Sequence, residues 1–313
     1  MRGGASTRDK ADLATQPRRS VRRAEAVEHV PLAVDALMLA VWSPHGSQGR
    51  STIAAALAHT FAKGLKLPGE VLLVDADTYA PAQHVLHGAT EITAGVLAAA
   101  RLVRQERYSD DEHDRVTLSL HGYRLLTGVT APERWAELDE HASTLLIHEL
   151  GQRAKVTVFD IANELDAGIV EPMLGIRRNQ LTLSVLQRAD IVLVVAAADQ
   201  VSIARLVNEL PTLLSQARGR VILVINRMRT SAIGTSAKKQ ILEVLETLPS
   251  TTPLDVVFVP DDPRACDYAL LAGEPVTAVR NRSGFAKGMR ELASRINSTH
   301  ADSARAHQTE RQS

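Results

Sequence analysis

Residues 43–52 read SPHGSQGRST. This stretch follows an apolar run that ends at Trp42, and it precedes a segment in which apolar residues recur every fourth position, the spacing of one helix face. Gly46 and Gly49 let backbone amides approach an oxyanion closely, and the start of a helix adds free N–H groups and the positive end of a dipole. A strand, a loop of small residues and a helix in this order predict a phosphate-binding loop.

The loop differs in two places from the usual phosphate-loop pattern G-x-x-x-x-G-K-[ST]. Pro44 replaces the first glycine, and Arg50 replaces the lysine. Arginine keeps the charge and can hold phosphate with two parallel hydrogen bonds, but it is bulkier than lysine. Ser51 lies where a hydroxyl can ligate Mg²⁺. The alternative is a glycine-rich turn without a ligand. The nucleotide contacts expected in the loop are Gly46, Ser47, Gln48, Gly49, Arg50, Ser51 and Thr52.

Beyond the loop, short apolar runs rich in Val, Ile and Leu alternate with segments of helical spacing. The apolar runs cover residues 37–42, 71–74, 123–126, 156–159, 191–196, 221–225 and 256–259. The helical segments include residues 51–62, 202–216 and 238–248. Continuously apolar runs indicate strands buried on both faces. The alternation predicts a doubly wound α/β fold, with a mostly parallel sheet and helices on both faces. The acidic segment 108–114 is expected to be a surface loop.

Polar residues useful to a nucleotide come directly after three of the apolar runs. They are Asp75, Asp160 and Asn226. In open α/β sheets, ligands bind at the carboxyl ends of the strands. These three residues, which are far apart in the sequence, are therefore expected at one rim of the sheet.

The composition limits the class of protein. Of the 313 residues 45% are hydrophobic, enough for a substantial core, and the formal net charge is zero, which excludes a generic polyanion binder. Cys266 is the only cysteine, so an intramolecular disulfide is excluded and a reducing compartment fits. No apolar run suits a transmembrane helix and no secretory signal is evident, so a cytoplasmic protein is expected.

Three regions are expected along the chain. Residues 1–33 form a basic N-terminal arm without hydrophobic periodicity, which predicts disorder. The arm is interpreted either as a solvated tail or as a weak contact with DNA or an acidic membrane. Residues 34–296 form the nucleotide-binding domain, and residues 297–313 form a polar C-terminal tail that is expected to be flexible.

Taken together, these motifs resemble the MinD/ParA/Mrp superfamily of deviant Walker A ATPases, a SIMIBI-like group of P-loop NTPases. Within it, the likeness is greatest to actinobacterial CpaE-like proteins, and it covers about residues 35–295. The family loop reads K-G-G-x-G-K-[ST]-T. His45 stands at the signature lysine, which in the family reaches across the dimer to the partner's nucleotide, and Arg50 stands at the phosphate lysine. Both family lysines are thus replaced.

The resemblance also implies roles for acidic residues. Asp75 and Asp77 belong to a match with the family's LLVDAD element, in which Asp75 would support Mg²⁺ and Asp77 would orient the attacking water. Asp160 matches the Walker B carboxylate, which binds Mg²⁺ through water, although the residues after it depart from the family pattern. The expected metal site is therefore Ser51, Asp75 and Asp160, and the expected catalytic residues are Asp77 and His45.

Two further elements resemble the part of the family that holds the base. Asn226 and Arg227 match an adenine-recognising NR pair, and an amide can pair with both a donor and an acceptor on a purine edge. Pro260 and Asp261 match the element that wraps the base. Residues 177–182, RRNQLT, resemble a segment typical of the CpaE-like subgroup. The role of this segment is left open, and a solvated helix end is its alternative interpretation.

The resemblance implies an ATP-binding switch that uses ATP or ADP and Mg²⁺ and forms an ATP-dependent homodimer. The implied processes are pilus assembly, septum placement or chromosome partitioning, with a peripheral location at the membrane through partners. Because both lysines are replaced, hydrolysis is expected to be weak or slow. A degenerate nucleotide-sensing or nucleotide-free scaffold of the same fold is the alternative. A ligase of the dethiobiotin synthetase or cobyrinate amidase kind would need a second substrate site, and no Cys–His constellation supports one.

Overall fold

The computed structural model describes residues 36–66, 69–89, 95–166, 177–229, 236–247 and 254–312. The N-terminal arm predicted for residues 1–33 lies outside this part of the chain. Among the described residues, every helix is too short or too polar to cross a membrane.

An eight-stranded sheet forms the centre of the molecule. Its strand order is β3-β4-β2-β5-β1-β6-β7-β8, and all neighbouring strands are parallel except the β3–β4 pair. The strands are β1 (Leu37–Trp42), β2 (Val71–Ala76), β3 (Leu118–Leu120), β4 (Tyr123–Leu126), β5 (Val156–Ile161), β6 (Ile191–Ala197), β7 (Arg220–Met228) and β8 (Asp255–Pro260). Each predicted strand is present, with up to four residues more than predicted.

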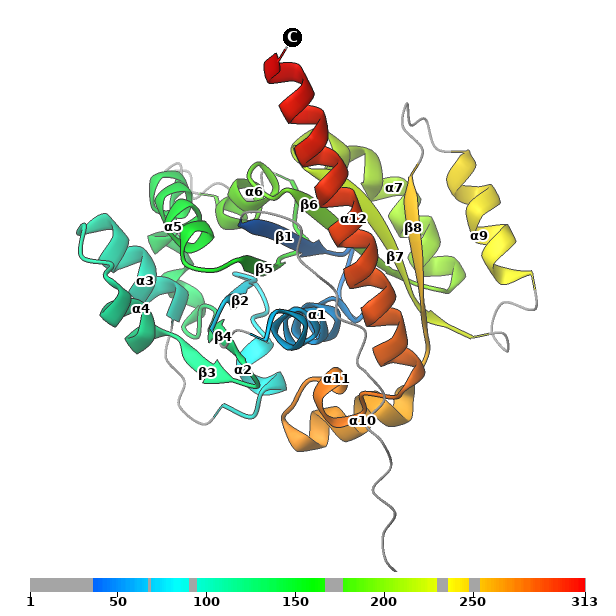
Figure 1. The fold of residues 1–313 in the computed structure, drawn as a ribbon, viewed down its shortest axis with the longest axis horizontal. Helices are drawn as coiled ribbons and strands as arrows, with labels where there is room; N and C mark the ends of the chain where they lie inside the picture. Colours follow the sequence, from blue (N-terminus) through cyan, green and yellow to red (C-terminus); the bar gives the residue numbers. More distant parts are fainter. Residues whose placement is uncertain are drawn as a thin grey trace, which may run out of the picture.

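Helices cover both faces of the sheet (Figure 1). One face carries α1 (Arg50–Leu65), α10 (Pro263–Ala272), α11 (Val276–Val279) and the long α12 (Gly284–Gln312). The other carries α3 (Gly95–Arg104), α5 (Glu140–Gln152), α6 (Gln180–Leu186), α7 (Gln200–Gln216) and α9 (Ala237–Glu246). Shorter elements are α2 (Gln83–Leu86), α4 (Asp110–Val116) and the 3-10 helix η1 (Pro132–Glu137). This architecture confirms the predicted doubly wound α/β fold.

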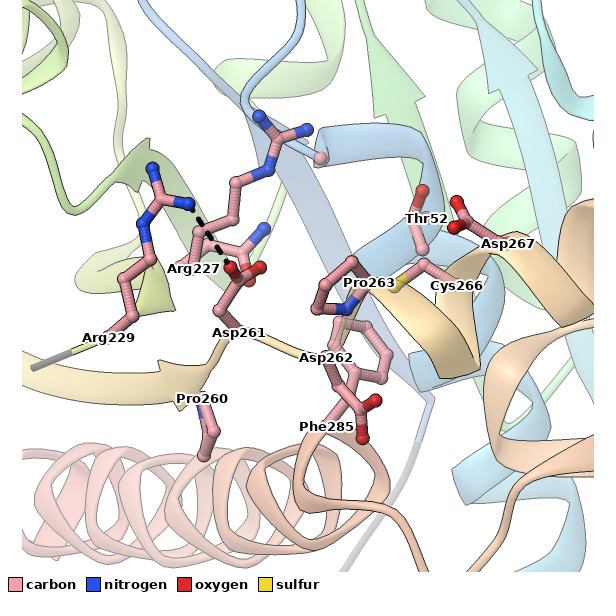
Figure 2. Close-up of a pocket in the computed structure, with 12 residues that line it drawn as sticks. Thr52, Arg227, Arg229, Pro260, Asp261, Asp262, Pro263, Cys266, Asp267 and Phe285 are labelled. Atoms are coloured by element: carbon pink, nitrogen blue, oxygen red, sulfur yellow. Dashed lines mark ion pairs between the residues drawn. The ribbon is translucent and has the colours of Figure 1, made fainter. Parts of the chain in front are cut away.

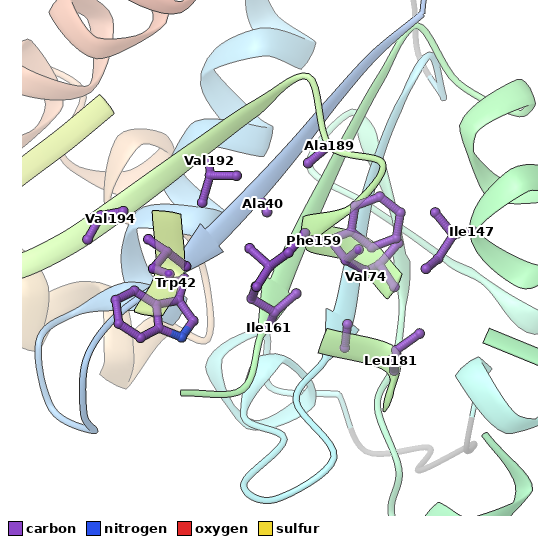
Figure 3. Packing of buried hydrophobic residues seen from close by; sticks show 14 of the residues in the cluster. Ala40, Trp42, Val74, Ile147, Phe159, Ile161, Leu181, Ala189, Val192 and Val194 are labelled. Atoms are coloured by element: carbon purple, nitrogen blue, oxygen red, sulfur yellow. The ribbon is translucent and has the colours of Figure 1, made fainter. Parts of the chain in front are cut away.

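Each face of the sheet has its own apolar core. In the core shown in Figure 3, Trp42, Phe159 and Val192 of the sheet belong to one cluster with Ile147 of α5 and Leu181 of α6. The second core joins the opposite side chains of the strands to α1, α10, α11 and α12. Burial on both faces explains why the strand sequences are apolar without alternation. The two cores hold the ends of β1, β2, β5 and β7 in fixed relative positions.

The structure differs from the sequence prediction at the edge of the sheet. The prediction of a surface loop at residues 108–114 is wrong, because helix α4 begins at Asp110. Ser109 caps this helix by accepting a hydrogen bond from the backbone N–H of Glu112 over 3.3 Å. The acidic residues that suggested a turn lie in the first helical turn, where negative charge is favourable. Strand β3, only three residues long, had not been predicted.

Helix α12 continues beyond the boundary expected at residue 297. It runs to Gln312, and Asn297 and Thr299 are buried although they are polar. The predicted start of the C-terminal tail therefore does not coincide with the end of regular structure. The polar sequence lacks an apolar stripe, which is why its helical continuation was not expected.

His87 gives the protein an expected pH dependence of stability. Its Nδ1 donates to the carbonyl oxygen of Gln83 over 2.7 Å, and its Nε2 accepts from the hydroxyl of Tyr123, so the neutral ring is held in one tautomer. Burial lowers the pKa of His87 from 6.5 to about 4. The folded protein therefore binds this proton more weakly than the unfolded chain. The stabilising contribution is complete above pH 6.5 and is lost as the pH falls toward 4.

We expect His87 to lower the free energy of unfolding by on the order of 1–2 kcal/mol between about pH 7 and about pH 5. Urea denaturation at a series of pH values measures this change. Burial also lowers the pKa of His59 and of His113 to about 4, so these residues act in the same direction. A His87→Gln variant should lose less stability than the wild type over the interval. An equal loss would contradict the role assigned to His87.

Candidate functional site

The loop after β1 is locked to the end of β7. Gly49, the residue before α1, has a φ of +88°, a conformation that glycine adopts without strain. The Asn226 side-chain amide donates to the backbone carbonyl of Gln48 over 2.9 Å. A Cβ atom placed on Gly49 would lie 2.4 Å from Asn226 Nδ2. The glycine thus permits the close approach that joins two segments far apart in the sequence.

The buried side chain of Gln48 also holds this loop in place, through contacts with β6 and with His45. The Oε1 of Gln48 accepts from the backbone N–H of Ala197 at the end of β6 over 2.6 Å. Its Nε2 lies 2.9 Å from the Nε2 of His45. His45, the residue at the place of the signature lysine, is therefore held against its own loop. Its predicted catalytic role stays a prediction.

Two carboxylates pair with Arg50 at the carboxyl ends of β2 and β5, and a third, Asp75, lies beside Asp160 in the sheet. Asp75 and Asp160 are neighbours in the sheet register, as expected for strand ends at one rim. The Arg50 Nε donates to Asp160 Oδ1 over 2.9 Å, and its Nη2 donates to Asp77 Oδ2. The side chains of this ion-pair network are 10% exposed for Arg50, 3% for Asp77 and fully buried for Asp160. Arg50, predicted to contact phosphate, thus lies against two of the predicted acidic site residues.

Gln83 of α2 completes the network, and no sequence motif pointed to it. Its fully buried side-chain amide donates to Asp160 Oδ2 over 2.8 Å and to the backbone carbonyl of Ser51 over 3.0 Å. Its backbone N–H donates to Asp75 Oδ2 over 2.9 Å. Gln83 therefore connects β2, β5 and the first turn of α1. Only the tertiary fold brings these three segments together, so the sequence held no local signal for it.

Burial and like charges set the ionisation of the site. Burial, together with the neighbouring Asp160 charge, raises the pKa of Asp75 well above that of an ordinary carboxyl group. Burial by itself would lower the pKa of Arg50, but the Asp160 and Asp77 carboxylates more than offset it, so the pKa of Arg50 is raised. Arg50 is therefore a permanent cation between two acidic side chains.

Asp75 and Asp160, two of the three expected Mg²⁺ ligands, do not fit direct coordination of the ion in this arrangement. Mg²⁺ needs oxygen ligands close to octahedral geometry, with carboxylate oxygens free to face it. Both oxygens of Asp160 accept hydrogen bonds, from Arg50 and from Gln83. Both oxygens of Asp75 also accept hydrogen bonds, from the backbone N–H groups of Gln83 and Asp77. Among the described residues, His, Cys, Asp and Glu side chains form no cluster of three suited to a metal.

A pocket of about 330 Å³ opens beside the loop, between the ends of β7 and β8 and the start of α10 (Figure 2). The four residues predicted to hold the base all line it, together with Gly49 and Thr52 of the loop and α1. Those four are Asn226, Arg227, Pro260 and Asp261. Arg229, which had not been singled out, pairs with Asp261 over 3.8 Å across the pocket (Figure 2). Sequence reasoning thus chose residues that the fold brings to one pocket.

The segment 177–182, whose role was left open, holds the turn that follows Asp77. The Arg178 guanidinium donates to the Thr78 carbonyl over 2.9 Å and lies 4.3 Å from the centre of the Tyr79 ring. The Arg178 carbonyl in turn accepts from the Thr78 hydroxyl over 2.7 Å. These reciprocal contacts fix the turn whose N–H groups at Tyr79 and Ala80 bind Asp77 Oδ1.

Replacing Arg178 by alanine should loosen this turn. We expect a loss of about 1–2 kcal/mol in the free energy of unfolding, from the cation–π contact and the hydrogen bonds. Hydrogen exchange of the Tyr79 and Ala80 amides should become faster in the variant. Arg177→Ala is the control, because Arg177 is exposed. Unchanged exchange at both amides in Arg178→Ala would show that Arg178 does not hold the turn.

Comparisons with known proteins bear on the fold. No protein-family model and no curated protein matches this sequence. Among solved structures, a ParA family ATPase from Chlorobium tepidum TLS is similar, with a TM-score of 0.67 and 21% identity over 82% of this chain and 98% of that chain. The septum site-determining protein MinD of Pyrococcus horikoshii, complexed with Mg-ADP, has a TM-score of 0.58 and 17% identity over 82% and 94%.

A putative plasmid partition protein from Borrelia burgdorferi, bound to AMPPNP, has a TM-score of 0.59 and 17% identity over 84% of this chain and 98% of that chain. At these identities the likeness establishes the fold. The chain therefore has the α/β P-loop fold of the ParA and MinD ATPases. The likeness extends over most of this chain and most of each similar chain.

Proposed function

We propose that this chain is a nucleotide-binding protein of the MinD/ParA type, which binds ATP or ADP between the 43–49 loop and the pocket beside it. One observation carries the proposal. Four residues chosen as base contacts, from two separate segments, line one pocket with Gly49 of the predicted phosphate loop. The free N–H groups at the start of α1 supply the anion-binding end of this site.

The similar solved structures support the class of ligand. The MinD of Pyrococcus horikoshii holds Mg-ADP, and the plasmid partition protein of Borrelia burgdorferi holds AMPPNP. By analogy we place the phosphates on the loop Gly46–Gly49 with Ser51 and Thr52, and the base near Asn226 and Arg227. Pro260 and Asp261 would cover the base from β8.

Weak hydrolysis is part of the proposal. Asp77, the residue expected to orient the attacking water, accepts from the N–H groups of Tyr79 and Ala80 with one oxygen and from Arg50 with the other. A carboxylate with both oxygens engaged is poorly placed to activate water. Phosphoryl transfer depends on positioning and charge stabilisation, so turnover should be slow.

The cellular role follows from the same likeness. We propose a CpaE-like switch in spatial organisation, such as pilus assembly, septum placement or chromosome partitioning. It would act in the cytoplasm as an ATP-dependent homodimer, in contact with that machinery and, through it, with the membrane periphery. The proposal includes no role for the N-terminal arm beyond a weak contact with DNA or membrane.

A second candidate function is a nucleotide-free scaffold of the same fold. The observation that favours it is the closed network of Arg50, Asp77, Asp160 and Gln83, which satisfies the acidic side chains without a ligand. A scaffold would keep the fold and its partner surfaces and lose nucleotide binding.

Isothermal calorimetry with ATP and ADP decides between the two functions. We expect saturable binding by the wild type and binding about tenfold weaker in Arg227→Ala, because this pocket residue is lost. Arg205→Ala, an exposed change on α7, is the control and should bind as the wild type does. Light scattering with and without ATP then tests dimerisation. Absence of binding to both nucleotides would favour the scaffold.

A further inference from the structure

Arg50 forms two buried ion pairs that phosphate binding by the loop does not require. Its guanidinium bridges Asp77, which directly follows β2, and Asp160 of β5. The remaining donor, Nη1, is buried and has no hydrogen-bond partner among the described residues. A buried cationic donor without an acceptor is costly, so it indicates a group that arrives later.

Asp160, one of the two carboxylates that Arg50 bridges, belongs to the expected metal site, where a divalent cation would neutralise it, and Asp77 is the residue expected to orient water. Such a cation draws acidic side chains together and neutralises them. Here the guanidinium does both, with a planar fork that suits carboxylate and phosphate oxygens alike. Gln83 donates to the second oxygen of Asp160 over 2.8 Å, so both oxygens of that carboxylate already accept a hydrogen bond within the protein.

We propose that the Arg50 guanidinium takes the place of the divalent metal, neutralising Asp77 and Asp160 and offering Nη1 to a phosphate oxygen, so that nucleotide binds without Mg²⁺. This inference rests on the proposed nucleotide binding. The ligand is accordingly the free anionic form of ATP or ADP, not its magnesium complex.

Three features of the site fit this assignment. Arg50 and its two partners are nearly or fully buried, so solvent cannot screen the pairs. The positive charge is on α1, at whose first turn the phosphates would lie, so one side chain can serve carboxylates and phosphate together. The free Nη1 supplies the hydrogen bond that the carboxylates leave unused.

Calorimetric titration with ATP in excess MgCl₂ and, separately, in EDTA tests the inference. For the wild type we expect dissociation constants within about threefold of each other in the two buffers. Arg50→Lys keeps a cation on the loop but offers no planar fork, so it cannot hold both carboxylates at once. In this variant we expect Mg²⁺ to strengthen binding by at least about tenfold.

Arg205→Lys is the matched control, because Arg205 is exposed on α7 and the same side-chain exchange should leave the wild-type behaviour unchanged. A wild type that binds ATP in MgCl₂ and loses about tenfold or more of its affinity in EDTA would overturn the inference and leave nucleotide binding intact. Arg50→Lys with no magnesium dependence would also overturn it. Absence of binding in both buffers would overturn the proposed function itself, and the inference with it.

Discussion

Replacing Arg50 by methionine should lower the free energy of unfolding by about 3–5 kcal/mol. Methionine has a similar length and no charge, so Asp77 and Asp160 stay buried without their cation. Removing one partner of a buried ion pair is far more damaging than removing a surface pair, because the remaining charges cannot reach water. Asp75 belongs to the same cluster of acidic groups, and its pKa is already raised by burial and by the Asp160 charge.

Urea denaturation near neutral pH measures this loss. Arg101→Met is the control, because Arg101 pairs with Glu137 at the surface over 2.7 Å and is 55% exposed. We expect the control to change stability by less than about 1 kcal/mol. Adding Asp160→Asn to Arg50→Met should recover part of the loss, because a neutral amide remains in place of an unpaired charge. Equal losses in Arg50→Met and in the control would refute the account of the network.

Gly49→Ala should abolish most nucleotide binding and should also destabilise the fold. The added Cβ would lie 2.4 Å from Asn226 Nδ2, and the φ of +88° is strained for any residue with a side chain. The loop must move, which breaks the hydrogen bond from Asn226 to the Gln48 carbonyl. We expect a loss of about 2–3 kcal/mol in the free energy of unfolding and of at least about tenfold in ATP affinity.

Gly46→Ala is the matched control in the same loop. A Cβ atom on Gly46 would have no heavy atom within 4 Å. The fold should therefore keep its stability to within about 0.5 kcal/mol. Denaturation and calorimetry on both variants separate a steric effect at Gly49 from a general intolerance of the loop to side chains. Equal damage at the two glycines would point to the second explanation.

The sequence was sufficient to predict the strands and the polar residues at the rim of the sheet. The apolar runs predicted every parallel strand, because burial on both faces favours nearly continuous runs of apolar residues. Asp75, Asp160 and Asn226 were placed correctly at strand ends, since a parallel sheet gathers these ends at one rim. The pocket residue Pro260 was chosen from the family resemblance, and the fold places it at the end of β8.

The sequence was insufficient to predict which partners the buried polar side chains bind. Arg50 was expected on phosphate, and its pairing with Asp77 and Asp160 depends on how β2, β5 and α1 are arranged in space. Gln83 belongs to a four-residue helix without apolar periodicity, so nothing local marked it. Helix α4 was missed because its acidic residues are as typical of a turn as of a capped helix start.

The structure of this protein with bound ATP tests the central claim most directly. The account predicts the triphosphate within hydrogen-bond distance of the backbone N–H groups of residues 46–51. The base should lie in the pocket lined by Asn226, Arg227, Pro260 and Asp261. ATP bound elsewhere on the protein, with the loop and the pocket both empty, would contradict the account.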